Sequence, residues 1–143
     1  MKKLRILTKI ALVSSAMFLY GFITYENPEK EEIRMAIEEY FFKGKIKADK
    51  ELLNRIIHED WRLHNVNNGK LVKYVKSDFF SWLSDEENSE VKFNIEYIDV
   101  TGNVAAAKTT EEEGDYIWVD YFNMVKAEGK WWIIDKVACR IRK

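Results

Sequence analysis

Apolar residues recur with the spacing of a helix in the stretch that begins near residue 27. Four of them fall on one helix face: Ile33, Ile37, Tyr40 and Phe41. Asn27 suits the N-cap and Pro28 the first helical position, and the glutamates that follow complement the helix dipole. Lys43-Gly44-Lys45 predicts the helix end, with glycine as the left-handed stop. A second, short helix is predicted after Asp49, with apolar residues turned inward.

A hairpin and a third helix are predicted next. Residues 61–66 form an extended run, Asn67-Asn68-Gly69 is a strong hairpin turn, and residues 70–75 return from it. Ser77 is the expected N-cap of a helix that carries Phe79, Trp82 and Leu83 on one side.

The spacing between apolar residues then changes from about four positions to two, which predicts strands. Val91, Phe93, Ile95 and Tyr97 alternate with polar residues. Further strands are expected at 104–110, 116–126 and 130–141, with an acidic loop at 111–115 and a turn at Glu128-Gly129. Helices first and four antiparallel strands last predict an α+β fold, with helices laid on one face of a curved sheet.

Three local sequences resemble the nuclear transport factor 2-like superfamily, and within it the "putative lumazine-binding", polyketide-cyclase-like branch. They are IRMAIEEYFFKGKI (33–46), IIHEDWRL (56–63) and VDYFNMVKAEGKWWIIDKV (119–137). The resemblance covers nearly all of residues 29–138. It implies a cystatin-like, cone-shaped antiparallel sheet with the N-terminal helices on its concave face. One departure is His58-Glu59-Asp60, where this family often has His-Pro-Asp.

The N-terminal segment predicts export. Residues 1–9 are basic, and residues 10–25 carry no charge. Such a run is short for a bilayer span, which needs about 20 residues, but it suits the apolar region of a signal peptide. We therefore expect a signal peptide or membrane anchor at 1–26 and a nuclear transport factor 2-like domain at 27–143. The domain would be periplasmic, secreted or membrane-tethered, and the membrane would be touched only by the N-terminal segment.

Composition narrows the function further. The chain has a net charge of −1, but the four charges in residues 1–25 are all basic, so the other 118 residues carry −5. A net-acidic body without a basic stripe argues against nucleic-acid binding. The single Cys139 excludes an internal disulfide and a thiolate zinc site, and we interpret it as a small buried hydrophobe.

The resemblance implies a pocket between the concave sheet face and the helices, lined by aromatic residues and a few polar groups. Asp120 is the sharpest candidate within it, because it lies mid-strand with Trp118 and Phe122 on the same face. It could act as a general base, or it could form an ion pair with Lys136 on the next strand. Simple pairing through the Glu128-Gly129 turn places Asp120 and Lys136 on opposite faces, and a bulge would reverse this.

Two functional classes stay open. The favoured one is a non-catalytic binding or accessory domain for a small apolar or aromatic ligand. Its expected ligand-binding residues are Tyr40, His64, Trp82, Tyr97, Trp118 and Asp120. The alternative is a small isomerase or dehydratase with Asp120 as base. No cofactor is expected.

The two histidines and an adjacent tryptophan pair complete the candidates. His58, His64 and a carboxylate could hold a metal, but we interpret both histidines as hydrogen-bonded structural residues and expect no metal site. Trp131 and Trp132 are neighbours in one strand, so they must face opposite sides of the sheet. An exposed indole there predicts a homodimer through the sheet.

Overall fold

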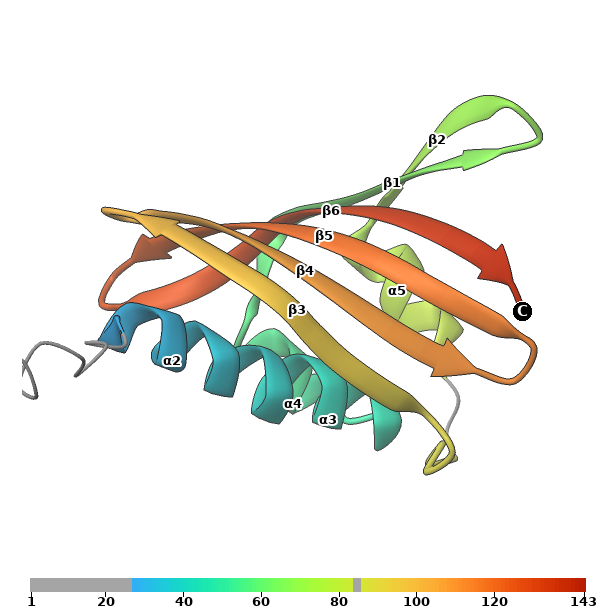
Figure 1. Cartoon of the computed structure of the whole chain (residues 1–143), viewed down its shortest axis with the longest axis horizontal. Coiled ribbons are helices and arrows are strands. Elements are labelled where there is room, and N and C mark those ends of the chain that lie inside the picture. Colours follow the sequence, from blue (N-terminus) through green and yellow to red (C-terminus); the bar gives the residue numbers. More distant parts are fainter. Residues whose placement is uncertain (1–26, 84–85) are drawn as a thin grey trace, which may run out of the picture.

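A long helical stretch lies across one face of the sheet (Figure 1). The computed structural model describes residues 27–83 and 86–143, so the predicted leader at 1–26 lies outside the described residues. The stretch consists of α2 (Pro28–Ala36), the π-helical turns η2 (Ile37–Phe42) and α3 (Lys43–Ile46). Asn27 caps it as predicted, because its Oδ1 accepts from Glu29 N at 3.0 Å.

Two short helices complete the helical layer. α4 (Lys50–Asn54) is capped by Asp49, as predicted. α5 (Lys76–Trp82) begins one residue before Ser77, so the predicted Ser77 cap is wrong. The Asp78 carboxylate instead accepts from Val75 N at 2.9 Å. In the described part of the chain, no helix is long and apolar enough to cross a membrane.

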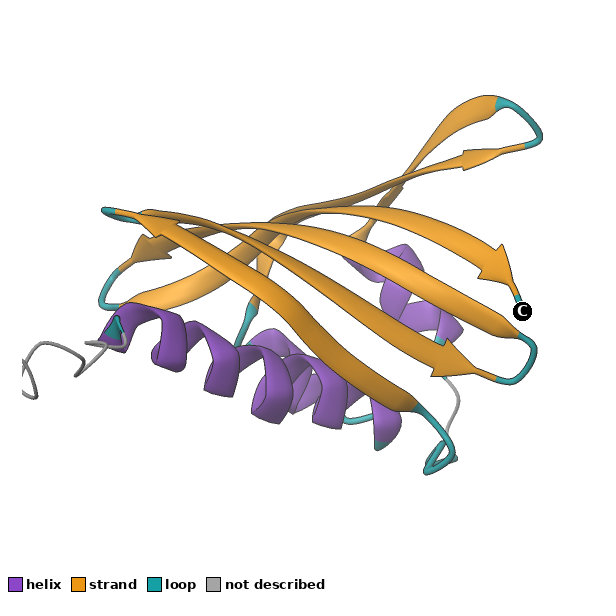
Figure 2. Cartoon of the chain, viewed as in Figure 1, coloured by secondary structure: helices purple, strands orange, loops and turns teal. Residues whose placement is uncertain are grey.

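Six strands form one curved sheet in the order β2-β1-β6-β5-β4-β3. Their bounds are β1 (Ile57–Asn67), β2 (Lys70–Val75), β3 (Lys92–Thr101), β4 (Val104–Glu113), β5 (Tyr116–Ala127) and β6 (Lys130–Arg142). All neighbours are antiparallel except β1 and β6, which run parallel. The helices all lie on one side of this sheet (Figure 2), which confirms the predicted α+β architecture.

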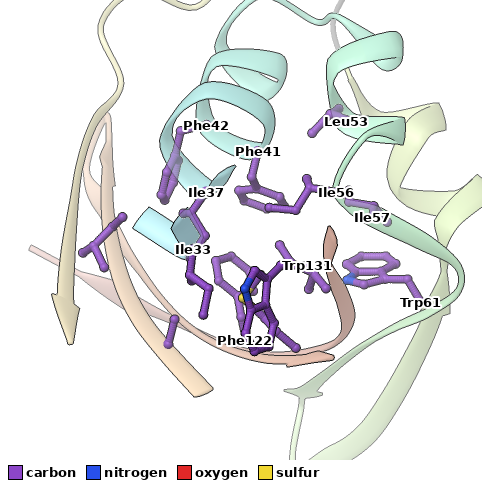
Figure 3. Packing of buried hydrophobic residues seen from close by; sticks show 14 of the residues in the cluster. Ile33, Ile37, Phe41, Phe42, Leu53, Ile56, Ile57, Trp61, Phe122 and Trp131 are labelled. Atoms are coloured by element: carbon purple, nitrogen blue, oxygen red, sulfur yellow. The ribbon is translucent and has the colours of Figure 1, made fainter. Parts of the chain in front are cut away.

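The core fills the space between the concave face and the helices (Figure 3). Ile33, Ile37 and Phe41 come from the predicted helix face, and they meet Phe122 and Trp131 of the sheet. Trp131 is buried and Trp132 is half-buried on the other face, as the strand period requires.

Four further local predictions were wrong. Residues 111–113 extend β4 rather than forming an acidic loop, and Glu111 is buried. Gly44 lies inside α3, and the left-handed residue after the helix is Ala48, with φ 53°. A register shift between Ile95 and Tyr97 turns Tyr97 outward, although its alternation predicts burial. Cys139 is exposed, because it lies on the convex face.

Candidate functional site

Four polar residues are buried on the concave face: Thr109, Glu111, Asp120 and Lys136. They come from three adjacent strands of the sheet. Thr109 of β4 lies directly opposite Asp120 of β5, and Asp120 lies opposite Ala138 of β6. A polar group buried in an apolar core is costly unless it is paired, so this cluster needs a specific explanation.

Asp120 and Lys136 form a buried ion pair, because a bulge in β6 brings them to one face. Met124 pairs with Ile133 and Asn123 with Asp135, so Ile134 is an extra residue in β6. The simple register is therefore wrong beyond this point, and Lys136 lies opposite Phe122. Lys136 Nζ lies 2.7 Å from Asp120 Oδ2, with side-chain exposures of 8% and 1%. The same ammonium lies 5.5 Å from the centre of the Phe41 ring.

A second ion pair joins the helical layer to the sheet. Lys45 of α3 donates to Glu111 Oε1 of β4, and Glu111 is almost fully buried. The helix therefore supplies a cation next to the buried carboxylate of the strand. The two buried carboxylates at this end of the concave face, Asp120 and Glu111, thus each have a lysine partner.

Several acceptor oxygens in this cluster nevertheless lack a hydrogen bond of ordinary geometry. Among the described residues, no donor meets Thr109 Oγ1, Glu111 Oε2 or either carboxylate oxygen of Asp120. The 2.7 Å contact from Lys136 provides charge compensation without a well-directed hydrogen bond. A buried acceptor left unmet costs about 1–3 kcal/mol.

A cavity of about 200 Å³ lies beside this cluster, between α5 and the strands β5 and β6. Its lining is aromatic and aliphatic with three charged groups: Lys45, Leu63, Phe79, Trp82, Leu83, Glu113, Trp118, Lys136 and Ala138. The small side chain of Ala138 leaves the sheet floor open between the two tryptophans. Both lysines of the buried ion pairs reach this cavity, while their carboxylate partners lie behind them.

The structure brings together only part of the predicted site. Trp82 and Trp118 line the cavity, and Asp120 lies behind Lys136. Tyr40 lines a separate groove of about 500 Å³ between α2, η2 and the start of β6, where Arg55 lies 5.7 Å from its ring centre. Tyr97 points away from the concave face.

His64 also lies away from the cavity. Its Nδ1 is 2.9 Å from Asp135 Oδ1, and it lines a cleft beside β6. His58 Nδ1 accepts from Asp60 N at 3.2 Å, and its ring meets Trp132 edge-on at 5.5 Å. Both histidines are hydrogen-bonded, as predicted, and they line different cavities.

One group of side chains has the composition of a metal site. His58, Glu59 and Asp60 each place a ligand atom within 4.8 Å of the others. All three lie toward solvent, where such groups are common without an ion. The neighbouring Lys76 donates to Ile57 O at 2.8 Å, and burial lowers the pKa of its ammonium.

Of the residues that line the cavity, the sequence predicts only Trp82 and Trp118 as ligand-binding, and Lys45, Glu113 and Ala138 are among those that it does not identify. Lys45 lies in the predicted helix end and Glu113 in the predicted acidic loop. Short sequence motifs do not identify such residues, because the role of each residue depends on which strand lies opposite the helix.

A known protein family matches most of the chain. The family model described as "putative lumazine-binding" matches residues 28–137. A search of curated proteins found no match.

Solved structures share the fold. A nuclear transport factor 2-like protein of unknown function from Shewanella baltica OS155 is 24% identical, with a TM-score of 0.70, covering 79% of this chain and 96% of that chain. Another, from Methylobacillus flagellatus KT, is 23% identical, with a TM-score of 0.71, covering 83% and 97%. A "putative ketosteroid isomerase" from Shewanella frigidimarina NCIMB 400 is 13% identical, with a TM-score of 0.56, covering 73% and 91%. At these identities the likeness concerns the fold alone.

Proposed function

Because the chain belongs to the "putative lumazine-binding" family of nuclear transport factor 2-like proteins, we propose that it binds a small molecule in the cavity under α5. The observation that carries this proposal is an aromatic-lined cavity that the two lysines of the buried ion pairs, Lys45 and Lys136, also line. Small-molecule sites combine an apolar lining with a few placed polar groups.

The size and lining of the cavity restrict the ligand. Its volume of about 200 Å³ is below the roughly 300–1,000 Å³ of sites for drug-sized molecules. Trp82 and Trp118 offer two indoles for contact with a flat ring, and the lysines offer N–H donors. The ligand is therefore a compact ring system with acceptor groups at its edge.

Binding can be tested with lumazine as the probe. Saturable quenching of tryptophan emission is expected in the parent protein, and native mass spectrometry of freshly purified protein should show a bound small molecule. Ala138→Phe fills the cavity floor and should abolish both signals. The matched control is Val137→Phe, which adds the same ring on the opposite face. Failure to detect any bound molecule, by either method, would overturn the proposal, as would equal signals in Ala138→Phe.

An enzyme of the isomerase or dehydratase type is the second candidate. Asp120 is a buried carboxylate without a directed hydrogen bond, and one structural neighbour carries the name of such an enzyme. Lys136 occupies the space next to Asp120 Oδ2, so a substrate would have to displace this ammonium before Asp120 could accept a proton. This requirement favours binding over catalysis. Proton exchange at a carbon next to a ketone, measured with small cyclic ketones and lost in Asp120→Asn, would support the enzyme instead.

Export is proposed from the basic start and the uncharged run at 10–25. Fractionation of cells that make the chain with a C-terminal tag should place residues 27–143 outside the cytoplasm. Recovery of the full-length chain in the cytoplasmic fraction would contradict the proposal.

A homodimer through the convex face is proposed from its apolar side chains. Tyr121 and Val137 lie opposite each other on β5 and β6, and each is 45% exposed, with Ile141 further along β6 at 50%. A contiguous exposed apolar surface of this kind is more often a protein interface than a surface that stays in contact with solvent.

A further inference from the structure

The C-terminal part of β6 has a free edge. The parallel pairing of β1 with β6 ends at His64 and Val137, while β6 continues to Arg142. Beyond that point β1 stays paired with β2 as far as Asn67 and Lys70. Figure 1 shows this hairpin diverging from the red end of β6. Among the described strands, only β5 pairs with Ala138–Arg142.

A cleft of about 540 Å³ separates this edge from the hairpin. The hairpin side presents two strongly exposed apolar residues, Val66 at 69% and Leu71 at 74%. Asn65 also lines the cleft, and its Oδ1 is buried without a hydrogen-bond partner among the described residues. The cleft is therefore lined by unpaired backbone groups of β6, by apolar side chains of the hairpin and by a side-chain oxygen without a hydrogen-bond donor.

Basic residues predominate around the cleft, and the acidic Asp135 places its Oδ1 2.9 Å from Nδ1 of the cleft-lining His64. The segments 63–67, 70–73 and 137–142 contain Lys70, Lys73, Arg140 and Arg142, and no acidic residue. This local excess contrasts with the net-acidic body of the domain. A partner with acidic side chains would be attracted here and oriented along the strand.

We propose that this cleft binds an extended, acidic segment of a partner protein, which pairs with the free edge of β6 as an added strand. An exposed edge is a template for such pairing, with main-chain hydrogen bonds providing affinity and side-chain contacts providing selectivity. A second copy of this chain is a poorer occupant, since edge-to-edge pairing would place Arg140 and Arg142 of both copies together. This cleft shares only Trp118 and Ala138 with the lining of the proposed ligand cavity, and the proposal does not depend on ligand binding in that cavity.

The probe is a fluorescein-labelled octapeptide of alternating valine and glutamate, whose binding is followed by fluorescence anisotropy. Two matched peptides separate the contribution of strand pairing from that of charge. One carries an N-methyl group on every second residue, and the other has lysine in place of glutamate. Each should bind at least about tenfold more weakly, because the first blocks strand pairing and the second reverses the charge. On binding the parent peptide, backbone amides within Ala138–Arg142 should become protected from hydrogen exchange.

The protein variant is Lys73→Glu/Arg142→Glu, which reverses two exposed charges beside the cleft. It should also lower affinity by about tenfold or more. Lys47→Glu/Lys50→Glu makes the same charge change at the exposed ends of α3 and α4 and should leave binding unaltered. Equal binding of the N-methylated peptide, or full displacement of the peptide by heparin without amide protection, would identify a general polyanion surface and overturn the proposal.

Discussion

Asp120 and Lys136 are the two residues whose effect on stability depends most on their partner. Both side chains lie in the interior, where an isolated charge is far more costly than in water. Lys136 also lies near the Phe41 and Phe122 rings, whose faces favour a cation. The aromatic surroundings therefore hold the ammonium in place, and Asp120 neutralises it.

Replacing Asp120 with Asn should destabilise the domain by about 3–5 kcal/mol, because it leaves Lys136 buried without a counter-charge. Chemical denaturation of the variant beside the parent measures this loss. The double variant Asp120→Asn/Lys136→Met removes both charges and should recover most of it. Parental stability in the single variant would show that Lys136 does not depend on Asp120.

The end of the long helix shows how an element is terminated by its neighbour. Asp49 N donates to Gly44 O at 2.8 Å and Ala48 has φ 53°, so the left-handed turn falls at Ala48. Gly44 is buried in the contact with α4. A Cβ added there would lie 2.9 Å from Leu53 Cγ and 3.2 Å from Asp49 O. Glycine at this position therefore serves close helix packing.

Two glycine-alanine exchanges should act in opposite directions. Gly44→Ala ordinarily stabilises a helix by about 0.5–1 kcal/mol. Here it should destabilise the domain by about 1–3 kcal/mol, since the added methyl group overlaps Leu53. Ala48→Gly should stabilise it by about 1 kcal/mol, because glycine adopts the left-handed conformation without strain. Thermal unfolding of both variants checks the signs, and a stabilising Gly44→Ala would refute the close contact.

The start of α2 is attached to the sheet by a charged cluster. Lys126 Nζ of β5 lies 2.8 Å from both Glu29 Oε2 and Glu32 Oε2, and Trp131 Nε1 donates to Glu29 Oε2 at 3.1 Å. The hydrogen bond from Lys126 is the main cause of the lowered pKa of Glu29. This cluster joins the first helical turn to both strands of the last hairpin.

The contribution of Glu29 to stability should depend on pH. Because its pKa is lower in the folded state, the stabilisation is present above the unfolded-state value of about 4.3 and is lost as pH falls through the folded value. Glu29→Gln should therefore be less stable than the parent at pH 7, and the difference should close in acid. Denaturation at several pH values measures it. Glu31→Gln is the control in the same helical turn, and a pH-independent gap for Glu29→Gln would contradict the assignment.

At the scale of the whole molecule, the two sheet faces have different roles. The concave face holds the core, the buried ion pairs and the proposed ligand cavity, while the convex face exposes apolar residues along β5 and β6. The helices cover one face only (Figure 2), and the proposed homodimer would cover part of the other.

A charge at the centre of the convex face should prevent dimerisation. Tyr121→Glu places a carboxylate on the exposed centre of β5 in each copy, so a symmetric interface would bring two of them together. Sedimentation velocity should show a dimer for the parent and a monomer for the variant. Met35→Glu changes an equally exposed apolar residue on α2 and should leave the dimer intact. A monomeric parent would contradict the proposed interface.

The sequence by itself determined most of the elements, because caps, turns and apolar periods are local properties. Asn27 and Asp49 cap their helices as predicted, and Asn68-Gly69 and Glu128-Gly129 turn with positive φ at both residues. These features depend on the conformations that a few adjacent residues prefer, so they can be recognised without knowing the rest of the fold. The family resemblance then placed the helices on the concave face.

Only the tertiary structure decided which face each residue occupies. One extra residue in β6 brings Lys136 to the face of Asp120, and a register shift in β3 turns Tyr97 outward. Side chains alternate with a period of two, so a single inserted residue inverts every position beyond it. The sequence marks neither bulge, because a bulge depends on the partner strand and on the curvature that the helices impose. For the same reason, the sequence does not reveal that Glu111 is buried against Lys45 or that the end of β6 is unpaired beside β1.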